Sequence, residues 1–187
     1  MKVRRLAAVI GATAGALAMM AAPAYAGSVP TPEGALPSRI GAAVEFQDIA
    51  SGGCADVINF STEHGGPVRE FPCRNTANQN WLIEPVLSAP GFFALRSINS
   101  NMCLDLRSGS VDDVHDGTLV QQWDCFPDSI GSEQWKLQLD NSGGPGALNL
   151  VTAVKGKCLD TNPRTGSALL HIATCSFGSR SQMWREQ

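Results

Sequence analysis

The chain repeats one pattern of cysteine, aspartate and tryptophan three times, at a step of about 50 residues. Each copy starts with a Cys-x-Asp triplet, closes a short loop with a second cysteine, and ends with Gln-x-Trp or Glu-x-Trp. In the first copy these landmarks are Cys54 with Asp56, then Cys73, then Gln79 with Trp81. Self-similarity of this length marks a supersecondary unit that cannot bury its apolar face alone, so the copies share one core.

The other two copies carry the same landmarks in the same order. The second has Cys103, Asp105, Cys125, Glu133 and Trp135, and the third has Cys158, Asp160, Cys175, Gln182 and Trp184. All six cysteines therefore lie on the frame. We interpret residues 44–91, 92–146 and 147–187 as the three repeats.

Short apolar pieces fill the space between the landmarks. They cover residues 44–46, 92–95, 135–139 and 148–151, and several alternate with period two. Clusters of Gly, Pro, Asn or Asp separate them, which is typical of short strands and turns. No window of helical period reaches the usual helix length, so the sequence predicts an all-β domain.

The quoted motifs carry a family resemblance. Cys-Leu-Asp, the Gln-x-Trp-Asp-Cys segment at residues 121–125 and the closing Gln-x-Trp together resemble the ricin-B-type lectin family, as found in secreted bacterial carbohydrate-binding domains. The likeness covers about residues 43–187. It implies a β-trefoil of three repeats that binds galactosides, xylans or related glycans.

The first residues do not belong to the repeats. Basic residues precede an apolar run over residues 6–22, and small residues at positions 24 and 26 suit a signal peptidase. We interpret residues 1–26 as a secretory signal, which places the mature protein outside the cell. A retained membrane helix is the alternative, but the Gly- and Ala-rich run falls short of the ~20 strongly apolar residues of a span. Residues 27–43 are predicted to be a flexible leader before the domain at 44–187.

Export determines how the cysteines are interpreted. Six cysteines in an oxidising compartment, paired at spacings of about 20 residues, predict three disulfides. The pairing that gives each repeat the same bond is Cys54–Cys73, Cys103–Cys125 and Cys158–Cys175. A metal site is the weaker alternative, because no Cys-x-x-Cys or Cys/His cluster is present. The acidic loop at 112–116 lacks the spaced oxygen ligands of a Ca²⁺ loop, so we expect neither a metal nor a cofactor.

Charge and motif content exclude several function classes. The net charge is −3, and loss of the signal removes three basic residues, so the mature chain is more acidic. Nucleic acid and anionic membranes attract clustered Lys and Arg, which this sequence lacks. It also lacks a nucleophile elbow and a phosphate-binding Gly-rich loop, so we predict no enzyme activity. Two facing carboxylates brought together by folding, as in a glycosidase, remain the alternative.

The closing tryptophans are predicted to form the shared core. Trp81, Trp135 and Trp184 each supply a large side chain to the centre, with direct ligand contact as the alternative. Gln79 and Gln182 are expected to satisfy nearby backbone groups. The resemblance implies that this Gln also fixes the sugar-binding Asp.

The resemblance assigns a binding set to the first repeat. It implies that the Asp of Cys-x-Asp accepts from sugar hydroxyls, an aromatic two residues before the second Cys stacks on the ring, and an Asn donates. The set here is Asp56, Phe71, Arg74, Asn78 and Gln79. Phe71 replaces the usual Tyr or Trp, and Arg74 stands where many members have a His. A turn role is the alternative for the Asp.

The second and third repeats match less completely. The second offers Asp105, Gln121 and Trp123, with Ser in place of the expected Asn. Trp123 either faces a ligand or packs against its own loop. The third keeps Asp160 but has Ala173 at the stacking position, so we expect weak binding or a turn role for Asp160.

Together these features predict a secreted, non-catalytic lectin. Its expected partner is a galactose- or xylose-type glycan or polysaccharide, bound at shallow sites in the first and second repeats. A protein partner that carries catalytic activity is also considered. The rival interpretation is a protein–protein interaction module, such as a protease inhibitor or a subunit of a toxin or enzyme complex.

Overall fold

The computed structural model describes residues 40–125, 131–161 and 169–187. The predicted signal peptide and most of the predicted leader lie outside these residues. The described residues belong to one compact unit, Thr31–Gln187. None of its described helices is long and apolar enough to cross a membrane.

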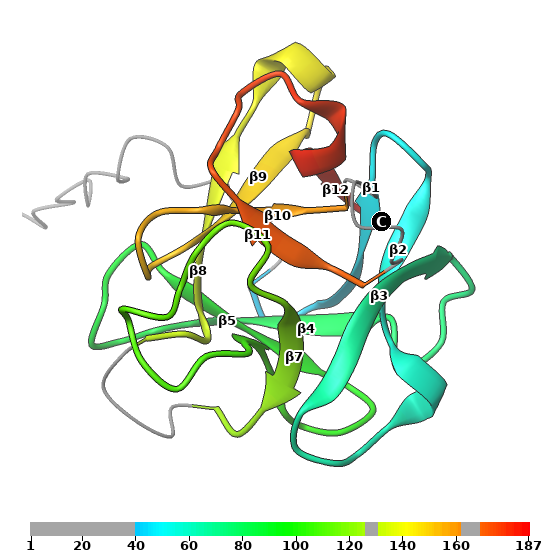
Figure 1. Ribbon diagram of the computed structural model, residues 1–187. Helices are drawn as coiled ribbons and strands as arrows, with labels where there is room; N and C mark the ends of the chain where they lie inside the picture. Colours follow the sequence, from blue (N-terminus) through cyan, green and yellow to red (C-terminus); the bar gives the residue numbers. More distant parts are fainter. Residues whose placement is uncertain (1–39, 126–130, 162–168) are drawn as a thin grey trace, which may run out of the picture. The chain divides into compact units, whose positions relative to one another are not determined.

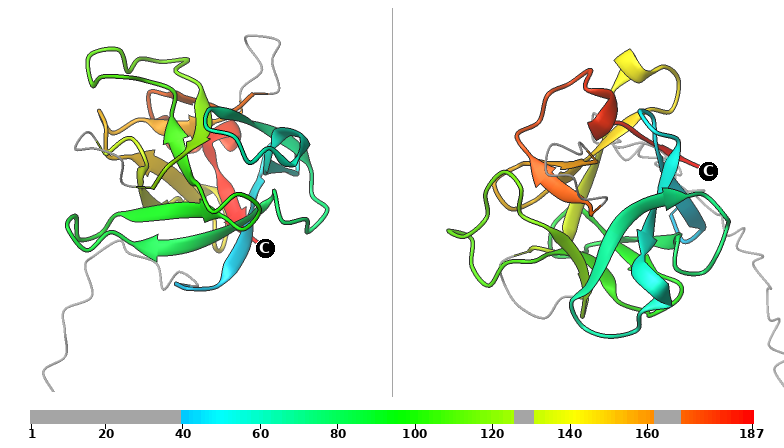
Figure 2. Two further views of the ribbon diagram at one scale, coloured as in Figure 1. Left: turned by 90° about the horizontal axis from the view of Figure 1, so that it is seen from below. Right: turned by 45° about the vertical axis from the view of Figure 1, so that its right-hand side comes forward.

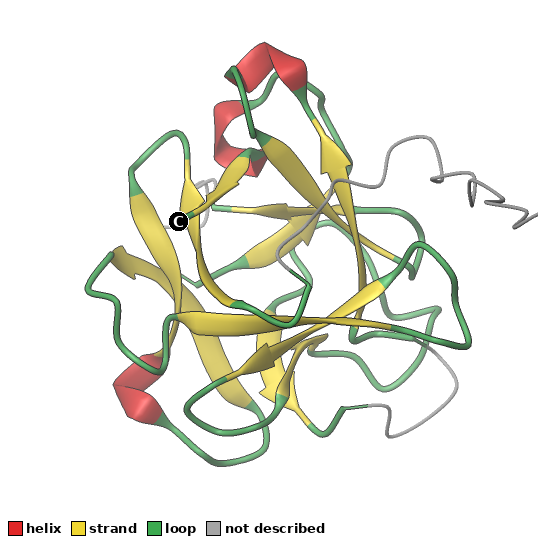
Figure 3. Cartoon of the chain, turned by 180° about the vertical axis from the view of Figure 1, so that it is seen from behind, coloured by secondary structure: helices red, strands yellow, loops and turns green. Residues whose placement is uncertain are grey.

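The described residues form short strands and three single-turn 3₁₀-helices (Figure 3). The strands are β1 (Ala43–Asp48), β2 (Gly53–Val57), β3 (Gly66–Pro72), β4 (Asn80–Pro85), β5 (Phe93–Ser97), β6 (Cys103–Leu106), β7 (Val120–Trp123), β8 (Gln134–Leu139), β9 (Leu148–Thr152), β10 (Cys158–Asp160), β11 (His171–Ala173) and β12 (Trp184–Glu186). The helices are η1 (Ile58–Phe60), η2 (Asn141–Gly143) and η4 (Arg180–Gln182). The predicted apolar pieces fall in β1, β5, β8 and β9, and the all-β prediction is confirmed.

Six strands close a barrel. β1 pairs with β4, β4 with β5, β5 with β8, β8 with β9, β9 with β12, and β12 returns to β1, all antiparallel. Each third of the sequence therefore contributes its first and fourth strand. Closure pairs every barrel strand on both sides, which removes the exposed edges that an open sheet would present.

The remaining strands form three hairpins, β2–β3, β6–β7 and β10–β11. Each hairpin pairs with the barrel through its first strand, and the hairpins contact one another at Gly66 with Gln122, Leu119 with His171, and Arg69 with Leu169. Figure 1 colours the chain along its sequence, so the three repeats can be told apart by colour. The left view of Figure 2 shows the hairpins gathered at one end of the barrel. This arrangement is a β-trefoil, as predicted.

Three tryptophans anchor the hairpins to the barrel. Trp81, Trp135 and Trp184 lie on β4, β8 and β12 and are fully buried, which confirms their assignment to the core. Each indole N–H donates to the backbone carbonyl between the Cys and the Asp of its own repeat. The acceptors are Ala55 at 3.1 Å, Leu104 at 2.9 Å and Leu159 at 3.3 Å. The buried ring thus fills the core while its polar edge fixes the Cys-x-Asp strand.

All three predicted disulfides are present. Cys54 bonds to Cys73, Cys103 to Cys125 and Cys158 to Cys175. Each joins the first strand of a hairpin to the residues that follow its second strand. Closing loops of this size stabilises a fold by about 3 kcal/mol each on the chain-entropy model.

Candidate functional site

Strand register decides which side chains meet on each hairpin. The Cys and Asp of Cys-x-Asp are two residues apart, so both point to the same face, together with the residues directly across the hairpin. Across from the cysteines lie Phe71, Trp123 and Ala173, and across from the aspartates lie Arg69, Gln121 and His171. The spacing of the sequence identified the first set and Gln121, but it missed Arg69 and His171.

The second repeat has a pocket of about 380 Å³. Its lining consists of Asp105, Arg107, Ser108, Gly109, Gln121, Trp123 and Ser132. The buried carboxylate of Asp105 accepts hydrogen bonds from Gln121 Nε2 at 3.0 Å and from the Ser132 hydroxyl at 2.6 Å. The three predicted residues of this repeat therefore lie together. The volume falls within the range of small-molecule sites.

Trp123 is the aromatic wall of this pocket. Its side chain is 37% exposed, in contrast with the three core tryptophans. Its ring meets the imidazole of His64 edge to face, with 4.8 Å between ring centroids, and His64 Nε2 lies 2.8 Å from Asp124 Oδ1. His64 belongs to the loop between η1 and β3, so the first repeat supports the indole of the second. The contact between His64 and Trp123 could not be predicted from the sequence, because the residues around His64 form no recognisable motif.

The closing Gln is a hub of local hydrogen bonds in two repeats. Gln79 Nε2 donates to Asp56 Oδ2 at 3.1 Å and to the Pro72 carbonyl at 3.0 Å, while its Oε1 accepts from the Arg74 N–H at 2.7 Å. Gln182 makes the equivalent bonds in the third repeat, to Asp160 at 2.8 Å, Thr174 O at 3.2 Å and Ser176 N at 2.8 Å.

Glu133 breaks this arrangement in the second repeat. Its side chain is fully buried, and its Oε2 has no hydrogen-bond partner among the described residues. An ionised carboxylate only accepts hydrogen bonds, so it cannot donate to Asp105 as the amides of Gln79 and Gln182 donate to their aspartates. The Ser132 hydroxyl is one of the donors that Asp105 has instead.

The first repeat has a smaller pocket, of about 220 Å³. Its lining consists of Asp56, Asn59, Phe60, Arg69, Phe71, Arg74, Thr76 and Asn78. Four of the predicted residues, Asp56, Phe71, Arg74 and Asn78, therefore border one cavity, and Gln79 supports the carboxylate from behind. Phe60 and Arg69 were not anticipated.

Hydrogen bonds within the protein occupy most of the acceptor positions of the Asp56 carboxylate. Oδ1 accepts from Arg69 Nε at 3.0 Å, and Oδ2 accepts from Asn78 Nδ2 at 2.9 Å and from Gln79. A carboxylate offers about four lone-pair positions, so about one is left. Asn78 Nδ2 also donates to the Val57 carbonyl at 2.8 Å, which uses its second hydrogen. In this arrangement Asn78 orients Asp56.

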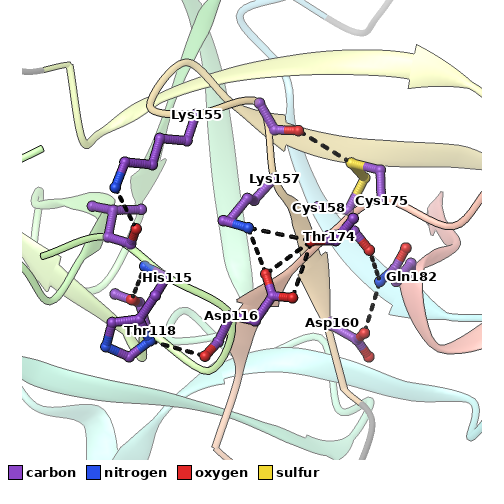
Figure 4. A network of polar contacts seen from close by, with 12 residues as sticks. His115, Asp116, Thr118, Lys155, Lys157, Cys158, Asp160, Thr174, Cys175 and Gln182 are labelled. Atoms are coloured by element: carbon purple, nitrogen blue, oxygen red, sulfur yellow. Dashed lines mark hydrogen bonds and ion pairs between the residues drawn. A yellow bond between two sulfur atoms is a disulfide. The ribbon is translucent and has the colours of Figure 1, made fainter. Parts of the chain in front are cut away.

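Asp160 of the third repeat lies in a different setting. It is buried beside Gln182, and Figure 4 shows it next to a polar network of Asp116, Lys157 and Thr174. Lys157 Nζ lies 2.5 Å from Asp116 Oδ1, and this hydrogen bond is the main cause that lowers the pKa of Asp116. The network ties the second repeat to the third. Among the described residues, no cluster of His, Cys, Asp or Glu has the arrangement of a metal site.

The comparisons with known proteins agree with this geometry. The profile of the Ricin-type beta-trefoil lectin domain matches residues 42–184. None of the curated proteins compared with the chain matches it.

Solved structures share the fold. A designed 3-fold symmetric protein, ThreeFoil, has a TM-score of 0.66 at 29% identity and covers 77% of this chain and 96% of its own. The Macrolepiota procera ricin B-like lectin in complex with lactose has a TM-score of 0.61 at 16% identity, and the match covers 79% of this chain and 96% of that lectin. The exo-beta-1,3-galactanase from Clostridium thermocellum has a TM-score of 0.66 at 19% identity, and the match covers 80% of this chain but only 30% of that enzyme. By its repeats, its fold and this profile, the chain belongs to the ricin-type β-trefoil lectin family.

Proposed function

We propose that this protein is a secreted, non-catalytic carbohydrate-binding protein that recognises galactose- or xylose-type glycans at sites in its first and second repeats. The observation that carries the proposal is the second-repeat pocket, where a carboxylate, an amide and a half-exposed indole border one cavity. Sugar hydroxyls need directional acceptors and donors, and the apolar face of a sugar ring needs a flat aromatic surface. Asp105, Gln121 and Trp123 supply these three features.

The choice of sugar follows from the family and from one relative. The solved Macrolepiota procera lectin holds lactose, a galactose-containing sugar. A shallow site of this kind binds a single sugar at the millimolar level, about −4 kcal/mol. Two sites on one chain raise the affinity for a polymer through effective concentration, so a polysaccharide is the natural ligand class.

Calorimetric titration with galactose, xylose and their oligomers tests the proposal, together with pull-down on insoluble galactan and xylan. Trp123→Ala removes the half-exposed ring without opening the core, so it is expected to abolish binding at the second repeat while the fold stays intact. Phe177→Ala is the matched control, because Phe177 is a 59% exposed aromatic that borders neither pocket.

The site assignment is tested by combining Asp56→Ala with Asp105→Ala. Loss of polysaccharide binding, with an unchanged near-UV circular dichroism spectrum, supports the two sites. Retained binding in a folded double variant refutes them. If Asp56→Ala or Asp105→Ala prevents folding, the asparagine substitutions at the same positions replace them.

The same measurements separate the rival functions. A protein-binding module would give a tight protein partner and no response to any sugar. An enzyme would release soluble sugars from the polysaccharide panel on prolonged incubation. A sugar response without product supports the lectin.

A further inference from the structure

The aromatic ring of the first-repeat pocket is covered by its own neighbours. Phe71 occupies the place that Trp123 has in the second repeat, across the hairpin from the first cysteine. The Arg69 guanidinium carbon lies 3.9 Å from the centroid of the Phe71 ring, and that of Arg74 lies 4.7 Å from it. Guanidinium groups bind to aromatic faces through cation–π attraction. A sugar that stacked on Phe71 would have to displace at least one of them.

The charge of this pocket also differs from that of the second-repeat pocket. Arg69 stands across the strand from Asp56 and forms an ion pair with it, whereas the neutral amide of Gln121 stands across from Asp105. Two guanidinium groups and one carboxylate line the first pocket. One guanidinium and one carboxylate line the second. The first pocket therefore has an excess of positive charge, although the chain as a whole is acidic.

The two arginines keep donors for a ligand. Arg69 uses only Nε, for Asp56, so its terminal nitrogens make no hydrogen bond within the part of the chain that the structure describes. The exposed Arg74 side chain makes none there either, and its contact is with the Phe71 ring. A guanidinium carries five N–H donors in a fixed fork that fits the paired oxygens of a carboxylate or sulfate.

Phe60 supplies an apolar surface to the same pocket. Its side chain is 52% exposed and lines the cavity. Its φ of 54° lies in the left-handed region, which costs about 1–2 kcal/mol for a residue with a Cβ. Asn99 of the second repeat holds this backbone, because its amide donates to the carbonyls of Phe60 and Ser61, both at 3.0 Å. An exposed aromatic kept in a strained conformation beside a pocket is typical of a ligand-binding surface.

We propose that the first-repeat pocket binds a sugar ring that carries a negatively charged substituent, a carboxylate or a sulfate. Arg74 and Arg69 hold the anion, and Phe60 contacts the ring. The pocket thereby selects acidic residues of a glycan, while the second-repeat pocket takes neutral ones. This inference rests on the proposed lectin function and assigns a ligand class to one of its two sites.

Titration with galacturonate oligomers and with their methyl esters tests this specificity, because the two ligands share a sugar ring and differ in charge. We expect the acid to bind at least about tenfold more tightly than the ester, a difference of about 1.4 kcal/mol. The acid should also lose affinity when salt is raised, because the contact is electrostatic. A sulfated galactan and its desulfated form make a second arm, which distinguishes carboxylate from sulfate recognition.

Variants locate the site. Arg74→Gln is expected to weaken acid binding about tenfold, whereas Arg74→Lys should restore part of the acid binding. Arg107→Gln is the matched control, because it removes an exposed arginine from the other pocket. Trp123→Ala should remove neutral-sugar binding and keep acid binding.

Three results overturn the inference. Equal affinity for acid and ester, with neutral-sugar binding still lost in Trp123→Ala, rejects the acidic site and leaves the lectin proposal standing. No response to any sugar rejects both. An acid response that Arg107→Gln removes and Arg74→Gln does not would place the anion in the second repeat, which also overturns the inference.

Discussion

Replacing Glu133 by Gln should stabilise this protein. Glu133 stands where Gln79 and Gln182 stand in the other repeats, and its Oε2 is buried with no partner among the described residues. An unsatisfied buried polar group costs about 1–3 kcal/mol. The Gln amide would supply the donor that reaches Asp56 Oδ2 at 3.1 Å and Asp160 Oδ2 at 2.8 Å in the other repeats. We therefore expect a gain of about 2 kcal/mol.

Thermal unfolding measures this gain. For a domain of this size, each kcal/mol shifts Tm by about 2–4 °C, so Glu133→Gln should raise Tm by about 4–8 °C. Gln182→Glu is the matched control, because it places a carboxylate beside Asp160 and should lower Tm by a similar amount. If Glu133→Gln lowers Tm or leaves it unchanged while Gln182→Glu behaves as expected, the Glu133 carboxylate has a compensating partner and the reasoning fails.

Three further changes have calculable effects. Trp135→Ala should lower the free energy of unfolding in urea by about 3–5 kcal/mol, because it leaves a cavity in the core and removes the hydrogen bond to the Leu104 carbonyl. A loss below about 1 kcal/mol would contradict the anchoring role of Trp135. Phe60→Gly should stabilise by about 1 kcal/mol, because Gly accepts a φ of 54°, and should weaken binding of acidic sugars; destabilisation would argue against strain. Asp140→Ala should cost about 1 kcal/mol at neutral pH, since Asp140 caps η2 and accepts from the Gly178 N–H at 2.9 Å. The Ser142 hydroxyl is the main cause that lowers the pKa of Asp140, so this stability is present above the ordinary value of 3.8 and is lost as pH falls below it. The difference between Asp140→Ala and the unchanged protein should therefore close in acid, and a difference that persists there would refute the assignment.

The fold could be predicted from the sequence because the closing tryptophans and the paired cysteines have the same structural role in every repeat. Each closing tryptophan donates its indole N–H to the Cys-x-Asp strand, and each disulfide joins the first strand of a hairpin to the residues that follow its second strand. Residue types that are needed three times at equivalent positions leave a periodic signal. The domain boundaries and the secretory signal have no such support and stay predictions.

Contacts between different repeats leave no periodic signal in the sequence, because each occurs at one place only. His64 meets Trp123, and Asn99 holds Phe60, across large separations in the chain. Their geometry depends on how the hairpins meet around the barrel. Arg69 is a different case, because alternation along β3 places it on the same face as Phe71 and across from Asp56. A prediction of the hairpin register would have found it.

The three repeats differ mainly in residues that do not hold the hairpins to the barrel. In each repeat the buried tryptophan and the disulfide hold the hairpin to the barrel, so the side chains across the hairpin can vary without disturbing the core. The varying pairs are Arg69 with Phe71, Gln121 with Trp123, and His171 with Ala173. Exchanging one pair between repeats should therefore move its ligand preference while stability changes little. Placing Gln and Trp at positions 69 and 71 should make the first pocket accept neutral sugars. A large loss of stability in that variant would show that the hairpin face and the core are coupled after all.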